Sequence, residues 1–145
     1  MAYTISQVAE MMGVTPSTLR YYDQQGLLPN LSRQNGVRQF EAEDFQWLRV
    51  LHCLKNTGMP IKKIKSYIDL VQDGDTSLQA RSELIQEQKA HILKQIAELE
   101  YYLQEIEFKE WYYARAMEAG TEAVVAEFSS KRATMELDQI PDDLR

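Results

Sequence analysis

Short hydroxyl side chains, an arginine and two tyrosines follow one another closely between positions 15 and 22 of this chain. Hydroxyl and phenol groups donate hydrogen bonds to phosphate oxygens, and a guanidinium can bind a phosphate or a guanine edge through two parallel bonds. A helix that presents such groups near its N-terminus is suited to enter the major groove of DNA. This reasoning assigns a DNA contact to Thr15, Ser17, Thr18, Arg20 and Tyr21.

The two adjacent tyrosines cannot both face the same way. Neighbours in a helix point about 100° apart, so at least one ring faces outward. Tyr22 lies three residues after Leu19, an inward position, which leaves Tyr21 on the exposed side beside Arg20. One ring is expected to cover the small core instead, and the spacing alone leaves open which one.

Cys53 is the single cysteine of the chain, which excludes an intramolecular disulfide and fits a reducing compartment. Arg49 lies one helical turn earlier and would favour the thiolate, the reactive form of the side chain. From the residues alone two interpretations stay open: a reactive thiol, or a buried cysteine that packs as a small hydrophobic group.

The chain lacks the patterns expected of an enzyme or a metal protein. His52 and His91 stand apart, and neither belongs to a cluster of histidines and thiolates of the kind that holds a metal. No motif brings a nucleophile and a base together, and no glycine-rich phosphate loop is present. We therefore expect no catalysis, no metal and no cofactor.

Charge is distributed unevenly along the chain. The net charge is −6, yet residues 1–65 contain eight Lys and Arg against five Asp and Glu, which is +3 and leaves −9 for the remainder. A basic module followed by an acidic one indicates a polyanionic partner for the first. No apolar stretch is long enough to cross a membrane and no secretory signal is evident, so we expect a cytoplasmic protein.

The elements that must position these side chains are mainly helical. Thr4 and Gln7 form a capping-box pattern, and Gly13 ends that first helix. Thr15 and Pro16 begin a second helix, which makes a helix-turn-helix. The short hydroxyl side chains therefore fall at the start of its second helix.

A small basic wing and two further helices should follow. Asn35–Gly36 is a strong signal for a two-residue hairpin, with Arg33 and Arg38 beside its tip. A third helix is predicted from about Ala42 to Asn56, and a fourth from near Pro60. The fourth is expected to turn Ile61, Ile64, Ile68 and Val71 inward and Lys62, Lys63 and Lys65 outward.

From residue 76 to Gly120 the pattern becomes that of one long helix with a narrow apolar seam. Hydrophobic residues recur every seven positions, with companions three residues earlier, at Ile85, Ile92, Ile96, Leu99, Leu103 and Ile106. At ~1.5 Å per residue this helix would be roughly 55–60 Å long. It needs a partner, most simply a second copy, unless it packs alone on its own N-terminal domain.

Two segments resemble the MerR family of dimeric transcription regulators: YTISQVAEMMGVTPSTLRYYDQQGLLP and NGVRQFEAEDFQWLRVLHCLKNTGMPIKKI. The resemblance covers about the first 75 residues, and its specific core is TLRYYD-x-x-GLL followed by NG-x-R. Three positions depart from the usual family residues: Val37 replaces a tyrosine, Glu41 a Ser or Thr cap, and Pro60 a serine cap.

The resemblance implies a fold, a mode of action and a set of contact residues. It implies a winged helix-turn-helix DNA-binding domain at 1–75, a dimerisation helix in an antiparallel coiled coil at 76–118, and a short acidic tail at 119–145. A homodimer would bend and untwist promoter DNA so that RNA polymerase can engage both promoter elements. The matching contact positions are Arg20, Tyr21, Tyr22, Arg33 and Arg38. Lys62 and Lys63 would lie near phosphates, although they could equally form a solvated face.

The segments CLKNTGMPIKKI and FKEWYYARA resemble a single-cysteine branch of the family that responds to aldehyde or nitrosative stress through its thiol. The resemblance therefore implies that Cys53 is alkylated or oxidised and so changes the state of the protein. An alternative is a small-molecule effector bound at the aromatic cluster of Phe108, Trp111, Tyr112 and Tyr113. A third interpretation, a coiled-coil adaptor for proteins, would require exposed apolar residues on the second helix.

Overall fold

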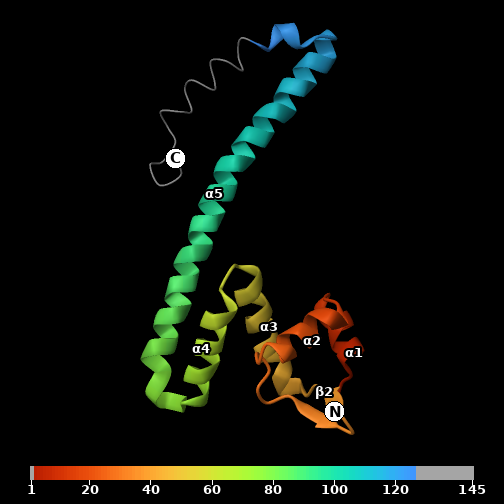
Figure 1. Cartoon of the computed structure of the whole chain (residues 1–145). Coiled ribbons are helices and arrows are strands. Elements are labelled where there is room, and N and C mark those ends of the chain that lie inside the picture. The colour runs from red at the N-terminus through yellow and green to blue at the C-terminus, as the bar shows by residue number, and fades with distance from the viewer. Residues whose placement is uncertain (1, 127–145) are drawn as a thin grey trace. The chain divides into compact units, whose positions relative to one another are not determined.

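The computed structural model describes residues 2–126 and confirms a mainly helical protein with a small two-stranded wing and a long helix near its C-terminus (Figure 1). The chain divides between Ala90 and His91 into two compact units. We call the first unit the head, and each unit is described by itself. None of the helices between residues 2 and 126 combines the length and the apolar composition needed to cross a bilayer.

The helix-turn-helix is built from α1 (Ile5–Met12) and α2 (Pro16–Gln24). The Gln7 amide donates to Thr4 Oγ1 at 3.2 Å, and the Thr4 amide donates to Gln7 Oε1 at 2.9 Å, which completes the predicted capping box. Gly13 ends α1 in the left-handed conformation, with φ of 70°. Thr15 then caps α2 by accepting the Thr18 amide at 3.2 Å.

The wing consists of β1 (Ser32–Gln34) and β2 (Val37–Gln39), paired antiparallel with Arg33 opposite Arg38. Asn35 and Gly36 have φ of 52° and 80°, the combination that a tight hairpin requires. Tyr3 and Phe40 exchange two backbone hydrogen bonds, of 2.7 and 2.9 Å. The base of the wing is thereby joined to the N-terminal segment.

The helices α3 (Ala42–Asn56) and α4 (Ile61–Gln72) complete the head, and a short 3-10 turn, η1 (Gly74–Ser77), follows them. The apolar side chains of these elements share one core, whose fully buried members are Val8, Leu19, Leu27, Phe40, Leu48, Leu51 and Ile64. Each such side chain stabilises the fold by roughly 1.5–3 kcal/mol through burial alone. The expectation that Val71 faces inward is wrong, because its side chain is exposed at the C-terminal end of α4.

The long helix α5 (Leu78–Ala119) runs without a break for 42 residues and is followed by the 3-10 turn η2 (Glu122–Val124). Five of the six seam residues are exposed, namely Ile85, Ile96, Leu99, Leu103 and Ile106, while Ile92 is partly buried. In the second unit Tyr112, Ala116 and Val125 form a small buried cluster. Most of the tail expected at 119–145 lies outside the described residues.

Candidate nucleic-acid interface

The N-terminal turn of α2 presents the predicted hydroxyl groups. Thr15 and Ser17 are exposed, and Thr18 is half-buried. The Thr15 and Thr18 hydroxyl oxygens lie 2.9 Å apart, and Thr15 also caps the helix. Within residues 2–126, the Ser17 side chain forms no hydrogen bond, so its hydroxyl is available to an incoming phosphate or base.

The structure decides which tyrosine belongs to the core. Tyr22 is 2% exposed, and its hydroxyl lies 3.1 Å from His52 Nδ1 on α3. Burial, together with the neighbouring Tyr21, raises the pKa of the Tyr22 phenol. Tyr21 is 39% exposed beside the exposed Arg20. A DNA contact by Tyr21 is therefore compatible with this geometry, whereas a contact by Tyr22 stays a prediction of the resemblance.

Both wing arginines bind the same carboxylate. Arg33 Nη2 and Arg38 Nε each lie 2.6 Å from Asp23 Oδ2, which projects from α2. The Arg33 side chain is 48% exposed and that of Arg38 only 19%. Asp23 thus braces the wing against the recognition helix and holds both arginines at that helix. The sequence pattern did not assign a role to Asp23.

The two lysines of α4 that are predicted to contact phosphates differ in their ion pairing. Lys63 Nζ lies 2.8 Å from Glu87 Oε2 on α5, an ion pair within the head. Lys62 is exposed and, among the described residues, its side chain forms no ion pair. Of the two predicted phosphate contacts, Lys62 is therefore the more available, because binding a phosphate would not require it to leave an ion pair.

Cys53 is exposed on α3, which overturns the alternative of a buried cysteine acting as a core side chain. Arg49, one turn earlier, is exposed as well. Thr57 Oγ1 donates to the Cys53 carbonyl oxygen at 2.7 Å, and Gln88 Nε2 on α5 donates to Thr57 Oγ1 at 2.6 Å. Gln88 is buried. The backbone at the thiol is thus two hydrogen bonds away from the long helix.

His52 precedes Cys53 on α3. It has no metal-binding partners, because residues 2–126 contain no group of three side chains that could hold a metal ion. Its Nε2 lies 2.8 Å from Asn56 Nδ2, and its Nδ1 faces the Tyr22 hydroxyl. Because an amide nitrogen only donates, Nε2 accepts and Nδ1 donates its proton to the Tyr22 oxygen. His52 therefore connects α3 to the recognition helix, a contact between residues thirty positions apart that no local pattern predicts.

The rings of the aromatic cluster in the second unit contact one another, but Trp111 and Tyr113 are 40% and 51% exposed. Phe108 and Trp111 stack with ring centroids 5.8 Å apart, and Tyr112 is buried with Ala116 and Val125. An open groove runs beside Phe108 and Trp111. Binding of an effector there stays a prediction. The adaptor interpretation requires exposed apolar residues on α2 and is not supported. The helix instead exposes Ser17, Arg20, Tyr21 and Gln24.

Comparison with known proteins agrees with this geometry. Residues 3–70 match the model of the MerR HTH family regulatory proteins, and residues 45–107 match that of the MerR DNA-binding region. An uncharacterised HTH-type transcriptional regulator of Haemophilus influenzae is 43% identical over 122 residues, which is 83% of this chain and 90% of that protein. The regulator AdhR of Bacillus subtilis is 33% identical over 62% of this chain and 65% of its own length.

A solved structure extends the likeness to three dimensions. The crystal structure of HiNmlR, described as a MerR family regulator lacking the sensor domain and bound to promoter DNA, superposes with a TM-score of 0.78 at 42% identity. The match covers 86% of this chain and 100% of that one. The chain described here therefore belongs to the MerR family of helix-turn-helix transcriptional regulators, which are DNA-binding proteins and not enzymes.

Proposed function

We propose that this protein is a cytoplasmic homodimer that distorts promoter DNA and responds to electrophilic, nitrosative or oxidative stress through Cys53. The observation that carries the DNA-binding part is the pairing of both wing arginines with Asp23 of the recognition helix. It places Arg33 and Arg38 at the recognition helix, which also exposes Arg20 and Tyr21. Cationic and hydrogen-bonding side chains of this kind suit a sugar–phosphate backbone. HiNmlR, a relative over its whole length, is bound to promoter DNA.

The exposed seam of α5 supports the homodimer. Leu99 and Ile106 are each 66% exposed, and the row continues through Ile96 and Leu103. A row of aliphatic side chains on a long helix is stabilised by pairing with a like helix, which buries both rows. We propose the region 76–118 as the dimerisation element of an antiparallel coiled coil, 1–75 as the DNA-binding domain and 119–145 as an acidic tail. RNA polymerase would be affected indirectly, through the shape of the promoter.

The exposure and surroundings of Cys53 support a sensing role. An aldehyde would react when the thiolate attacks its carbonyl carbon; a sulfur–carbon bond forms, and the carbonyl oxygen takes a proton from water. The product carries extra bulk at the last turn of α3, next to Thr57. Because Thr57 accepts from the buried Gln88, the added group can alter how α3 holds α5.

DNA binding is tested by fluorescence anisotropy on the DNA upstream of the protein's own coding region, with a scrambled duplex for comparison. We expect Arg20→Ala to weaken binding by about tenfold or more, as loss of a charged contact does. Lys94→Ala on α5 removes the same charge outside the head and should leave the affinity unchanged. Failure of the wild-type protein to prefer its upstream DNA, or equal affinity of the Arg20 variant, would contradict the proposal.

The thiol is tested by in vitro transcription with and without formaldehyde, together with mass spectrometry of the Cys53 peptide. Cys53→Ala should keep operator binding and lose the transcriptional response. A second variant, Cys53→Ala with Ser66→Cys, carries an exposed thiol elsewhere on the head and should be modified without responding. Full induction of Cys53→Ala would exclude the thiol and leave an effector at the aromatic cluster as the better candidate.

The hydrogen bonds that connect the backbone of Cys53 to α5 through Thr57 can be tested separately. Gln88→Ala removes both hydrogen bonds to Thr57, of 2.6 and 3.4 Å, and leaves Cys53 in place. Modification of Cys53 by formaldehyde should proceed as before, whereas the change in transcription should diminish. An unaltered response would show that Gln88 does not carry the signal.

A further inference from the structure

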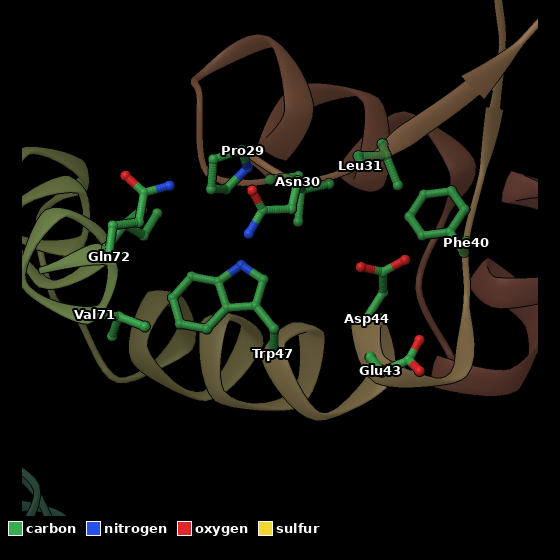
Figure 2. A pocket seen from close by; sticks show the side chains of 11 residues that line it. Pro29, Asn30, Leu31, Phe40, Glu43, Asp44, Trp47, Val71 and Gln72 are labelled. Carbon is green, nitrogen blue, oxygen red and sulfur yellow. The ribbon is translucent and has the colours of Figure 1, made fainter. Parts of the chain in front are cut away.

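The head contains a cavity of about 280 Å³, and its lining includes neither Cys53 nor any of the predicted DNA-contacting residues. Three elements surround it: the loop that follows α2, the first turns of α3 and the C-terminal end of α4 (Figure 2). It lies within one compact unit. Its volume lies just below the usual range of roughly 300–1,000 Å³ for small-molecule sites, so a fitting ligand is compact.

The floor of the cavity is apolar and already ordered. Leu28, Phe40 and Ile68 line it and are themselves buried in the core of the head. The Trp47 indole forms another wall and is held in place twice: Nε1 donates to the Leu27 carbonyl oxygen at 2.8 Å, and the ring stacks on Tyr67 with centroids 6.0 Å apart. A site with a fixed shape requires little reorganisation when a ligand binds.

The charged groups of the cavity are all of one sign. Glu43 and Asp44 line it, and no Lys, Arg or His is among its lining residues. Asp44 Oδ2 accepts the Glu41 amide at 2.8 Å, which leaves Oδ1 for another donor. In Figure 2 the Asp44 carboxylate and the Trp47 indole extend from α3 toward the loop that carries Pro29 and Asn30. An ammonium group at this edge would meet a carboxylate and an aromatic ring together.

We propose that this cavity binds a compact lipophilic organic cation, that is, a small hydrocarbon or aromatic body carrying one ammonium group. The body occupies the space between Leu28, Phe40 and Ile68, and the ammonium donates to Asp44 Oδ1, with Glu43 adding to the negative potential. An anion of the same shape is repelled by both carboxylates. A neutral ligand gains the apolar contacts alone.

The cavity also lies against both ends of the wing. Asn30 and Leu31 lead directly into β1, and Phe40 follows directly after β2. A bound cation therefore contacts the segments that begin and end the element carrying Arg33 and Arg38. Any effect of the cation on DNA affinity must be matched by an equal effect of DNA on the affinity for the cation.

Three probes of one shape and different charge test the proposal: 2-phenylethylammonium, 2-phenylethanol and phenylacetate. Trp111→Phe leaves Trp47 as the only tryptophan of the 145-residue chain, so its fluorescence reports on the cavity. We expect the ammonium to bind with a Kd below about 1 mM, about tenfold more tightly than the alcohol, and phenylacetate not to bind. The titrations need no DNA, so their outcome is independent of the proposed function.

Two variants locate the binding. Asp44→Asn keeps an oxygen for the Glu41 amide but removes the charge; it should weaken the ammonium about tenfold and leave the alcohol unchanged. Asp69→Asn, on α4 but outside the cavity lining, is the matched control and should change neither. Val71→Phe at the exposed rim adds bulk without adding a second tryptophan and should block both ligands. Equal affinities for the three probes, no saturation, or full binding by Val71→Phe would overturn the proposal.

Discussion

At the scale of single residues, Asp23 organises the predicted DNA-binding surface. Its Oδ2 atom accepts from two arginines at 2.6 Å each, but the two ion pairs differ in exposure. An exposed pair contributes little free energy, so Arg33 is easily released to a phosphate. Arg38 is largely covered, and its pair holds the wing against α2. The same carboxylate therefore holds Arg33 loosely and fixes the position of Arg38.

This difference predicts separable effects of the two arginines. Arg33→Ala and Arg38→Ala should each weaken binding to all DNA sequences and lower the slope of log K against log salt by about 0.9, one phosphate's worth. Only Arg38→Ala should also lower the melting temperature of the free protein. Anisotropy across a salt series and thermal denaturation measure the two effects. A slope unchanged by Arg38→Ala would show that Arg38 is not on the DNA backbone.

The buried Tyr22 predicts a pH dependence of stability. Its pKa is raised in the folded protein, so the native state keeps the phenolic proton where the unfolded chain has begun to lose it. The corresponding stabilisation is complete below about pH 10 and is lost as the pH rises through the higher folded pKa. Tyr22→Phe cannot titrate, so its free energy of unfolding should fall less between pH 9 and 11, roughly the range in which tyrosine ionises.

At neutral pH the same variant should be less stable, by about 0.5–1.5 kcal/mol, because the hydrogen bond to His52 is lost. Urea denaturation over a pH series measures both effects. Tyr21→Phe, whose ring is exposed, is the control and should match the wild-type protein at pH 7. An alkaline loss of stability as large in Tyr22→Phe as in the wild type would show that Tyr22 is not its source.

At the scale of elements, the wing depends on its two-residue turn. Asn35 and Gly36 both have positive φ, and the strand register that places Arg33 opposite Arg38 follows from the length of that turn. A Cβ atom on Gly36 would meet nothing within 4 Å. Any cost of a side chain there is therefore conformational rather than steric.

The turn can be tested without disturbing any contact. Gly36→Ala should destabilise the head by about 1–2 kcal/mol, because alanine is disfavoured in the left-handed region. Gly36→Asn fills the same open space with a residue that tolerates positive φ, so it should lose less. Chemical denaturation gives the ranking of glycine, asparagine and alanine. If alanine and asparagine were equally destabilising, the conformational explanation would fail.

At the scale of the whole molecule, the proposed homodimer depends on α5. The part of the helix after Ala90 lies outside the head and presents its seam residues to solvent. An exposed aliphatic row of this length is unfavourable in water, and pairing removes it. Two heads joined in this way could bind two half-sites of one promoter.

Charged residues introduced into the seam of α5 should dissociate the proposed homodimer. Leu99→Lys with Leu103→Lys should yield monomers at micromolar concentration by sedimentation, because like charges would then face one another. Operator affinity should fall by more than about tenfold, since two linked heads bind more tightly than one. Ala97→Lys, which adds charge on the opposite face, should stay dimeric. A wild-type protein that sediments as a monomer would contradict the dimer outright.

Much of the fold was predictable because its signals are local. Thr4 and Thr15 cap helices, Asn35–Gly36 turns the wing, and α3 begins at Ala42 and ends at Asn56 as the pattern predicts. These features depend on residues within a few positions of one another, whose preferred backbone conformations hold in any context. The continuous α5 follows for the same reason, since no glycine or proline interrupts it before Gly120.

Which side chains act together depends on how the helices and the wing pack. This packing buried Tyr22 rather than Tyr21, joined Asp23 to both wing arginines, paired Lys63 with Glu87 and brought Gln88 to Thr57. It also left Val71 exposed at the rim of an acidic, apolar cavity. These contacts join residues ten to thirty-one positions apart, or elements packed around one core. Sequence periodicity assigns a residue to one face of its helix. It does not determine which faces of two helices meet, because that depends on how the helices pack in three dimensions.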